Sequence, residues 1–252
     1  MAAVDLDGVP AHLLARRWSV PQVTVLRTAP STQDAVHDLG AAGAPHGAVV
    51  IALEQTAGRG RNGRTWHSPA GGVWLSVLLR PALARAVVGV LSIRAGLVVA
   101  DTVDELVGRG RARLKWPNDV LIDGRKVAGV LCEGRWQGDA LQWLALGVGV
   151  NVCNEVPRDA SVHAAALGEF LPHVRRLDVL DRLVPAVVAT GGGGVTLAEA
   201  ECLAFAERDW LRGRALRAPA AGRASGIRAD GALLVHDGAA VTAVLDGHVE
   251  FA

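Results

Sequence analysis

One stretch of the chain, residues 54–81, limits the possible folds more than any other. Apolar runs at residues 47–53 and 73–79 flank its polar part, and both runs are predicted to be strands of a buried sheet. Between them, residues 58–64 read G-R-G-R-N-G-R. A segment so rich in glycine and arginine is unsuited to a strand, so we expect a cationic loop at a strand end.

The arginines of this loop indicate what it binds. Arg59, Arg61 and Arg64 offer forked donors that match carboxylate or phosphate oxygens. The glycines between them let backbone amides approach the same anion. The sequence therefore predicts that the loop binds an acid, a phosphate or both.

The overall composition indicates that anion binding depends on this loop and not on the net charge of the protein. The 252 residues are 50% hydrophobic and 20% charged, with a formal net charge of +1, which indicates a globular protein without a global field for nucleic acid or acidic membranes. The amino terminus carries Asp5 and Asp7 and lacks the pattern of a signal peptide. The most apolar long region, residues 86–100, contains Arg94 and is too short to cross a bilayer. We therefore expect a cytoplasmic protein.

The three cysteines form no C-x-x-C pair. Cys132, Cys153 and Cys202 lie in or beside apolar runs, as free cysteines of a protein core do. We expect buried free thiols in a reducing compartment and no structural zinc site.

The first two thirds of the chain show alternating strand and helix patterns. Ser31 and Asp34 fit a capping box at a helix start, and the Asp123-Gly124 pair fits the turn of a β-hairpin. The expected helices span residues 31–40 and 81–107, and the expected strands span residues 23–26, 47–54, 111–116, 120–122, 126–133 and 141–152.

The last third changes from helices to short strands. Thr196 and Glu199 fit a second capping box, and the glycine run at residues 191–194 fits a flexible linker. After Gly213, short strands with glycine turns suggest a small barrel that docks on the larger part. The expected helices span residues 177–190 and 197–212, and the expected strands span residues 215–218, 225–228, 232–236, 241–245 and 248–251.

Residues 58–63 form a literal G-x-G-x-x-G. A dinucleotide site needs a helix directly after this motif and an acidic residue about twenty positions later. The chain continues with Thr65-Trp-His-Ser-Pro69 and Gly71-Gly72, and no acidic residue occurs between Glu54 and Asp101. We interpret the match as accidental.

Two glycines alternate along the strand expected at residues 141–152. Gly147 and Gly149 leave one face of the sheet without side chains. Either a flat ligand or another backbone lies close to that face, or the sheet simply packs tightly there. The sequence leaves both interpretations open.

The candidate functional residues stand at predicted strand ends and in the loops beside them. They are Ser31, Thr32, Gln33, Gln55, Arg59, Arg61, Arg64, Lys115, Asn118, Asp119 and Asn151. No P-loop and no Ser-His-Asp arrangement accompanies them. Several cations without a nucleophile suit a reaction hindered by charge repulsion, such as acyl adenylation, in which a carboxylate attacks the α-phosphate of ATP.

Several motifs of the chain resemble those of the biotin protein ligases and follow that family's order. They are S-T-Q-D at 31–34, E-Q-T-A-G-R-G-R-N-G-R-x-W-x-S-P at 54–69, G-V-W-L-S-V-L-L-R-P at 72–81, K-W-P-N-D-V at 115–120, R-K-V-A-G-V-L-C-E at 125–133 and G-V-G-V-N-V at 147–152. The glycine-punctuated strands near the carboxyl end are similar to the family's SH3-like end domain. The resemblance implies an α+β fold of the class II synthetase-like type. Its central mixed β-sheet, flanked by helices, would occupy residues 1–213, with a small SH3-like β-barrel in residues 214–252.

The resemblance also implies an activity that uses ATP and Mg²⁺. Biotin would be activated as biotinyl-5'-AMP with release of pyrophosphate, and then transferred to a lysine of a biotin carboxyl carrier domain. We expect no DNA binding, because the segment before the first predicted strand is too short for a helix-turn-helix domain. We also expect no membrane binding, and a monomer or weak homodimer.

Roles at the biotin end follow from the matched motifs. Ser31, Thr32 and Gln55 would bind the ureido head, while the arginine loop would close over the carboxylate and the acyl phosphate. The set implied for biotin is Ser31, Thr32, Gln33, Gln55, Arg59, Gly60, Arg61 and Lys115.

Roles at the nucleotide end rest on the same resemblance. The set implied for ATP is Arg61, Arg64, Lys115, Asn118 and Asn151. Asn151 is also the implied ligand of Mg²⁺. The implied catalytic cations are Lys115, Arg61 and Arg64, with Lys115 as the main one.

Three other functions compete with this one. A lipoate or octanoate ligase would share the fold but would favour an apolar acyl tunnel over the polar set of Ser31, Thr32 and Gln55. A non-catalytic biotin-sensing regulator would need a DNA-binding domain. A dinucleotide-binding oxidoreductase depends only on the glycine motif at residues 58–63.

Overall fold

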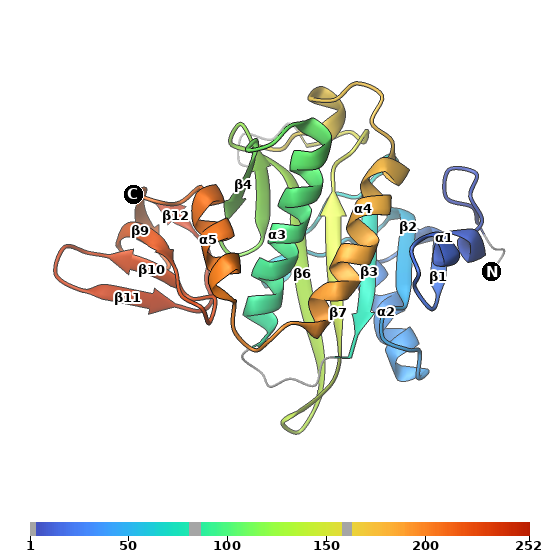
Figure 1. Ribbon diagram of the computed structural model, residues 1–252, viewed down its shortest axis with the longest axis horizontal. Coiled ribbons are helices and arrows are strands. Elements are labelled where there is room, and N and C mark those ends of the chain that lie inside the picture. Colours follow the sequence, from blue (N-terminus) through green and yellow to red (C-terminus); the bar gives the residue numbers. More distant parts are fainter. Residues whose placement is uncertain (1–3, 81–86, 158–162) are drawn as a thin grey trace.

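The computed structural model describes residues 4–80, 87–157 and 163–252. Its centre is a seven-stranded mixed sheet with the strand order β1-β2-β3-β7-β6-β5-β4 (Figure 1). β1 and β2 pair in parallel, and the other neighbours pair antiparallel. The strands are β1 (Val23–Ala29), β2 (Val49–Gln55), β3 (Val73–Leu79), β4 (Ala112–Lys115), β5 (Asp119–Ile122), β6 (Arg125–Gln137) and β7 (Ala140–Val150). The predicted mixed sheet is confirmed.

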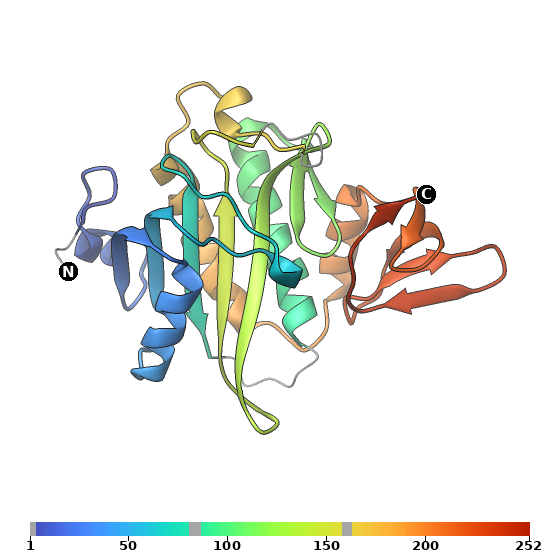
Figure 2. The same cartoon turned by 180° about the vertical axis from the view of Figure 1, so that it is seen from behind.

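Helices cover both faces of this sheet. α3 and α4 lie across one face (Figure 1), and α2 packs on the other, where Val36 joins a cluster with Val50, Leu78 and Ala145. The segment between β2 and β3 also crosses that second face (Figure 2). The helices are α1 (Ala11–Arg17), α2 (Thr32–Ala41), α3 (Val87–Val107), α4 (Arg176–Ala189) and α5 (Glu199–Arg208). None of the described helices combines the length and apolar character that crossing a bilayer requires. Residues 81–86 of the helix expected at 81–107, and residues 158–162, lie outside the described residues.

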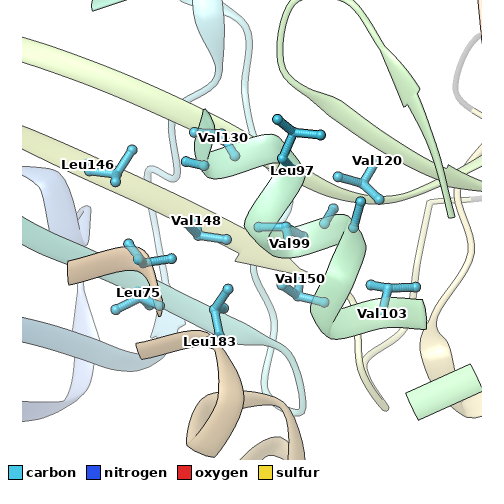
Figure 3. Close-up of a cluster of buried hydrophobic side chains, with 14 of the residues drawn as sticks. Leu75, Leu97, Val99, Val103, Val120, Val130, Leu146, Val148, Val150 and Leu183 are labelled. Atoms are coloured by element: carbon cyan, nitrogen blue, oxygen red, sulfur yellow. The ribbon is translucent and has the colours of Figure 1, made fainter. Parts of the chain in front are cut away.

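The main core lies between the sheet and the pair α3 and α4 (Figure 3). Along β7, Leu146, Val148 and Val150 point into this core at every second position, next to Val99 of α3. Because strand side chains alternate between faces, the intervening glycines belong to the opposite face. That opposite face therefore has space for the β2–β3 segment to lie close to the sheet.

A five-stranded antiparallel sheet follows α5, in the order β11-β10-β9-β8-β12. It is joined to the edge of the large sheet by hydrogen bonds from Trp116 Nε1 to the Gly231 carbonyl (2.9 Å) and from the Trp210 amide to the Leu114 carbonyl (2.9 Å). The strands are β8 (Ala215–Ala218), β9 (Gly222–Ile227), β10 (Leu233–His236), β11 (Val241–Val244) and β12 (Glu250–Phe251). This sheet is consistent with the expected SH3-like module, and the boundary after residue 213 stays a prediction.

The turn between β5 and β6 is the predicted hairpin turn. Asp123 and Gly124 have φ angles of 50° and 75°, the left-handed values that this two-residue turn requires.

The second predicted capping box is wrong. α5 begins after Ala198, whose amide donates to Glu201 (2.7 Å), and it ends at Arg208. The Thr196 carbonyl instead accepts a hydrogen bond from the buried Arg94 guanidinium (3.1 Å). Arg94 therefore moves the helix start two residues later.

The glycine run before α5 is not a plain linker. A Cβ at Gly193 would lie 2.4 Å from Nη1 of Arg94, and that guanidinium also donates to the Gly194 carbonyl (3.2 Å). The buried arginine pairs with the Glu201 carboxylate (2.5 Å). At Gly193, the absence of a Cβ lets this charged side chain pack directly against the backbone.

The prediction of three buried cysteines is wrong, because Cys132 and Cys202 are only partly buried. Cys153 is exposed, and its thiol donates to the Val174 carbonyl (3.0 Å). Burial raises the pKa of the Cys132 thiol to about 12 and also raises the pKa of Cys202.

These environments predict an order of thiol reactivity. Because the thiolate is the nucleophile, iodoacetamide at pH 8 should alkylate Cys153 first and Cys132 last. Peptide mapping by mass spectrometry over a time course measures this order. Labelling of Cys132 as fast as Cys153 would contradict it.

Candidate functional site

A cavity of about 900 Å³ extends over the glycine-bearing face of the large sheet and reaches the carboxyl-terminal sheet. It gathers residues from the start of α2, the end of β2, the arginine loop (residues 58–64) and the β4–β5 turn. All predicted site residues line it, namely Ser31, Thr32, Gln33, Gln55, Arg59, Gly60, Arg61, Arg64, Lys115, Asn118, Asp119 and Asn151.

One end of the cavity holds a buried network of neutral polar groups. Gln55 Oε1 accepts hydrogen bonds from the amide (2.8 Å) and hydroxyl (3.1 Å) of Thr32, and Gln55 Nε2 donates to Ser68 Oγ (2.8 Å). The Thr32 and Ser76 hydroxyls are 2.8 Å apart. Ser31 caps α2, since its hydroxyl accepts from the Gln33 amide (3.3 Å). Hydroxyls and amides can both donate and accept, so this end suits a neutral polar head group.

Gln33 contributes an unpaired acceptor beside this network. Its Nε2 donates to the carbonyls of Leu131 (3.1 Å) and Ala145 (3.4 Å), which fixes the amide between β6 and β7. Its Oε1 is buried without a hydrogen-bond partner. A Cβ at Gly147 would lie 3.1 Å from Gln33 Cδ, so this glycine leaves room for the glutamine.

The indole of Trp66 occupies the rest of the glycine-bearing face. A Cβ would lie 2.6 Å from Trp66 Nε1 at Gly149 and 3.2 Å from its ring at Gly129. The Lys126 ammonium covers the ring at 4.7 Å from its centroid. Trp66 Nε1 is buried and unpaired. The alternate glycines therefore admit a side chain of the protein itself, a possibility absent from both sequence-based interpretations.

This contact predicts the effect of a single methyl group. Gly149→Ala should displace Trp66 and cost about 1–3 kcal/mol of stability, the usual range for overpacking. Chemical denaturation measures the loss, and tryptophan fluorescence reports the moved ring. Gly89→Ala is the matched control, because a Cβ there meets nothing within 4 Å. A Gly149→Ala protein as stable as this control would show that Trp66 adjusts freely.

The arginine loop is a small hairpin across the sheet. The Gly60 amide donates to the Arg64 carbonyl (2.7 Å), and the Trp66 amide donates to the Gly58 carbonyl (2.9 Å). Asn62 at the tip has a φ of 56°, a left-handed value that asparagine tolerates better than most residues. No helix follows, as expected for an accidental glycine motif.

The three arginines of the loop differ in their contacts. Arg59 pairs with Asp34 and Glu133, and Arg61 pairs with Asp246 from the carboxyl-terminal sheet. Within the described part of the chain, no carboxylate pairs with Arg64. Its cation is available to an anionic ligand.

Lys115 is a partly buried cation of the site. Its ammonium lies 5.8 Å from the Trp210 ring centroid and 5.6 Å from that of Phe251, and no described carboxylate forms an ion pair with it. Burial lowers its pKa, Asp119 opposes this, and repulsion from Lys126 and other nearby cations adds to the lowering. An anion at this end would relieve that repulsion.

The two predicted asparagines have structural partners. Asn118 Nδ2 donates to the Val130 carbonyl (2.7 Å), so this side chain holds the β4–β5 turn against β6. The buried Asn151 Oδ1 accepts from Asn154 Nδ2 (3.1 Å). Residues 4–80, 87–157 and 163–252 contain no group of three His, Cys, Asp or Glu side chains placed to hold a metal.

Several lining residues were not predicted from the sequence. Trp66, Ser68 and Ser76 lie within or beside the matched motifs, but no local pattern gave them a role. Lys126 lies in the matched motif at 125–133, and the remaining residues come from distant segments and are Trp210, His248 and Phe251. Burial lowers the pKa of His248, and Arg64 and Lys115 lower it further. Only packing of the two sheets brings these groups to the cavity.

Comparison with known proteins agrees with this architecture. Residues 25–151 match the model of the biotin/lipoate A/B protein ligase family. The bifunctional ligase/repressor BirA of Bacillus subtilis is 42% identical over 130 residues, which are 51% of this chain and 39% of that protein. The biotin–[acetyl-CoA-carboxylase] ligase of Mycobacterium tuberculosis is 44% identical over 128 residues, 48% of this chain and 45% of that protein. These matches thus span less than half the length of the two relatives.

Solved structures extend the similarity beyond the matched sequence. The biotin protein ligase from Aquifex aeolicus in complex with biotin and ATP has a TM-score of 0.76 and 26% identity, over 91% of this chain and 98% of that chain. The family model alone covers half of the chain, from β1 to the residue that follows β7. The chain therefore belongs to the biotin/lipoate A/B protein ligase family.

Proposed function

We propose that the protein is an ATP-dependent biotin protein ligase. In the first step, a biotin carboxylate oxygen attacks the α-phosphorus of ATP, pyrophosphate leaves, and biotinyl-5'-AMP forms. In the second step, a lysine amine of a biotin carboxyl carrier domain attacks the acyl carbon, AMP leaves, and the amine loses a proton. The first step brings two anions together, and the second develops negative charge on the acyl oxygen and on the departing AMP. A cation-lined cavity stabilises charge of both kinds.

One observation carries this proposal. The same cavity joins a buried neutral polar network, centred on Thr32 and Gln55, to a cationic end at Lys115 and Arg64. Four strands (β3, β7, β6 and β5) separate β2, which carries Gln55, from β4, which carries Lys115. Because neighbouring strands lie about 4.8 Å apart, the two ends of the cavity are roughly 20–25 Å apart. This suits an elongated pair of ligands with a polar head at one end and a polyphosphate at the other.

Individual residues take the following roles. Ser31, Thr32, Gln33 and Gln55 bind the ureido head of biotin, and the unpaired Gln33 Oε1 accepts from one of its N–H groups. The cations of the opposite end stabilise the transferring phosphate and its leaving group, and they are Arg61, Arg64 and Lys115, with Lys115 as the main one. Arg61 lies over the acyl phosphate and retains the adenylate.

Magnesium fits this site only together with ATP. Mg²⁺ prefers oxygen ligands and is commonly held by phosphates plus one or two side chains. Asn151 offers one oxygen, so the phosphate oxygens must supply most of the coordination. When bound, the ion neutralises charge on the polyphosphate.

Pyrophosphate exchange tests the proposed reaction. The purified protein should exchange labelled pyrophosphate into ATP when biotin is added, and much less with lipoate or octanoate. Exchange with one of the other acids would keep the fold and the adenylation chemistry but assign a lipoate or octanoate ligase. A protein that exchanges with none of the three acids would not be an adenylating enzyme for any of them.

Two further expectations remain proposals. The carrier domain would dock where the cavity opens, and the protein would act as a monomer or weak homodimer without DNA. A gel-shift assay tests DNA binding, and light scattering measures the mass in solution.

A further inference from the structure

The guanidinium of Arg59 is held by carboxylates from two other segments. Its Nη1 lies 2.6 Å from Asp34 Oδ1 in α2, and its Nη2 lies 3.0 Å from Glu133 Oε2 in β6. Burial opposes the charge of Arg59, but the two carboxylates outweigh it and raise the arginine pKa. The side chain therefore has two protein partners, one on each terminal nitrogen.

Glu133 itself lies beside a histidine. Trp143 Nε1 donates to His37 Nδ1 (3.0 Å), so the proton of the neutral imidazole is on Nε2, which lies 3.8 Å from Glu133 Oε2. The His37 imidazole lowers the pKa of the Glu133 carboxyl, burial opposes this shift, and Arg59 lowers the pKa further. The carboxylate thus stays charged beside Arg59.

The position of Arg59 in the loop makes this contact important. Arg59 forms an isolated β-bridge with Thr65 at the base of the hairpin, and Gly60 and Arg61 come directly after it. Holding the Arg59 side chain fixes the base of the loop on α2 and β6. Arg61, two residues after Arg59, is thereby held in the cavity lining, where it pairs with Asp246.

We propose that Asp34, Arg59 and Glu133 form a loop anchor that positions Arg61 for the acyl phosphate. Arg59 is then a positioning residue, and its side chain does not bind the ligand carboxylate as the sequence comparison implied. The inference rests on the proposed biotin ligase function for what the loop positions. The anchor itself is a property of the protein without ligands.

Trypsin cleavage tests the anchor without any activity measurement. Asp34→Asn combined with Glu133→Gln keeps the shape of both side chains and removes both charges. Partly exposed ion pairs each contribute up to about 1 kcal/mol, so cleavage after residues 59, 61 and 64 should accelerate about 5- to 30-fold. Glu105→Gln on α3 is the control, since it removes a similar surface pair with Arg182 of α4. Unchanged loop cleavage in the double variant would overturn the anchor.

Biotin affinity separates an anchor from a direct ligand contact. If Arg59 acts through the two carboxylates, Arg59→Ala and the double variant weaken biotin binding by the same factor, and the triple variant is no weaker. If Arg59 binds the ligand carboxylate, freeing it in the double variant tightens binding while Arg59→Ala weakens it, and the proposal is wrong. The Asp34→Glu variant keeps the negative charge. Unlike Asp34→Asn, it should therefore retain wild-type loop cleavage and biotin affinity.

The two levels of the inference fail in different ways. If the wild-type protein shows no biotin-dependent exchange but the double variant is cleaved faster in the loop, the anchor is supported and the ligase proposal is wrong. Normal exchange with unchanged cleavage removes only the anchor. Thermal unfolding of each variant shows whether it is folded under the conditions of the comparison. If the double variant is unfolded, the single variant Asp34→Asn takes its place.

Discussion

Lys115→Ala should slow biotin adenylation about 10²- to 10³-fold, equivalent to about 3–4 kcal/mol of the barrier. The ammonium is enclosed by the Trp210 and Phe251 rings and is unpaired within the described residues. Its charge is therefore free to stabilise the phosphoryl oxygens, where negative charge grows in the transition state. Single-turnover formation of biotinyl-5'-AMP measures the effect, and a normal rate of this step would falsify the role.

Lys115→Arg is the matched control for charge. It keeps a cation but changes its shape, so it should recover part of the rate. Because burial lowers the pKa of Lys115, the free enzyme loses this ammonium at a lower pH than an exposed lysine would. The profile of kcat/KM for biotin, which reports the free enzyme, should therefore fall on the alkaline side below the usual lysine range. That limb should move to higher pH in Lys115→Arg.

Arg61→Ala should release the adenylate about 10- to 150-fold faster, since a charge-assisted hydrogen bond commonly contributes about 1.5–3 kcal/mol. The arginine stands near the tip of the loop and pairs with Asp246 when no ligand is present. A phosphate anion would compete for the same guanidinium. Stopped-flow dilution of enzyme loaded with labelled biotinyl-5'-AMP measures the release rate.

Asp246→Asn distinguishes two explanations of an Arg61 effect. It removes the same ion pair but keeps the arginine, so release should stay at or below the wild-type rate. If Arg61 only fastens the loop to the carboxyl-terminal sheet, both variants release the adenylate equally fast. That result would contradict a direct contact between Arg61 and the ligand.

The overall fold was largely accessible from the sequence, because its elements depend on local patterns. The strands on both sides of the arginine loop, the Asp123-Gly124 turn and the five short strands after Gly213 all follow from hydropathy and glycine positions. The wrong start of α5 had a non-local cause. Arg94, about a hundred residues earlier, occupies the carbonyl of Thr196.

The residues of the site were accessible from motifs, but their partners were not. The motifs place Arg59 in the cavity lining, as predicted, but pairing with Asp34 and Glu133 requires α2 and β6 to meet the loop. Trp66 lies in a matched motif, and nothing local shows that its ring lies on Gly149. Contacts between distant segments decide these roles, and a single sequence does not encode them as a pattern.

The cationic end of the cavity depends on both sheets of the protein. Lys115 ends β4 of the large sheet, and Phe251, which flanks it, belongs to β12 of the carboxyl-terminal sheet. A shift of the smaller sheet would therefore expose the Lys115 ammonium to water, even with the large sheet unchanged. Since burial lowers the pKa of this lysine, the position of the carboxyl-terminal sheet tunes the proposed catalytic cation.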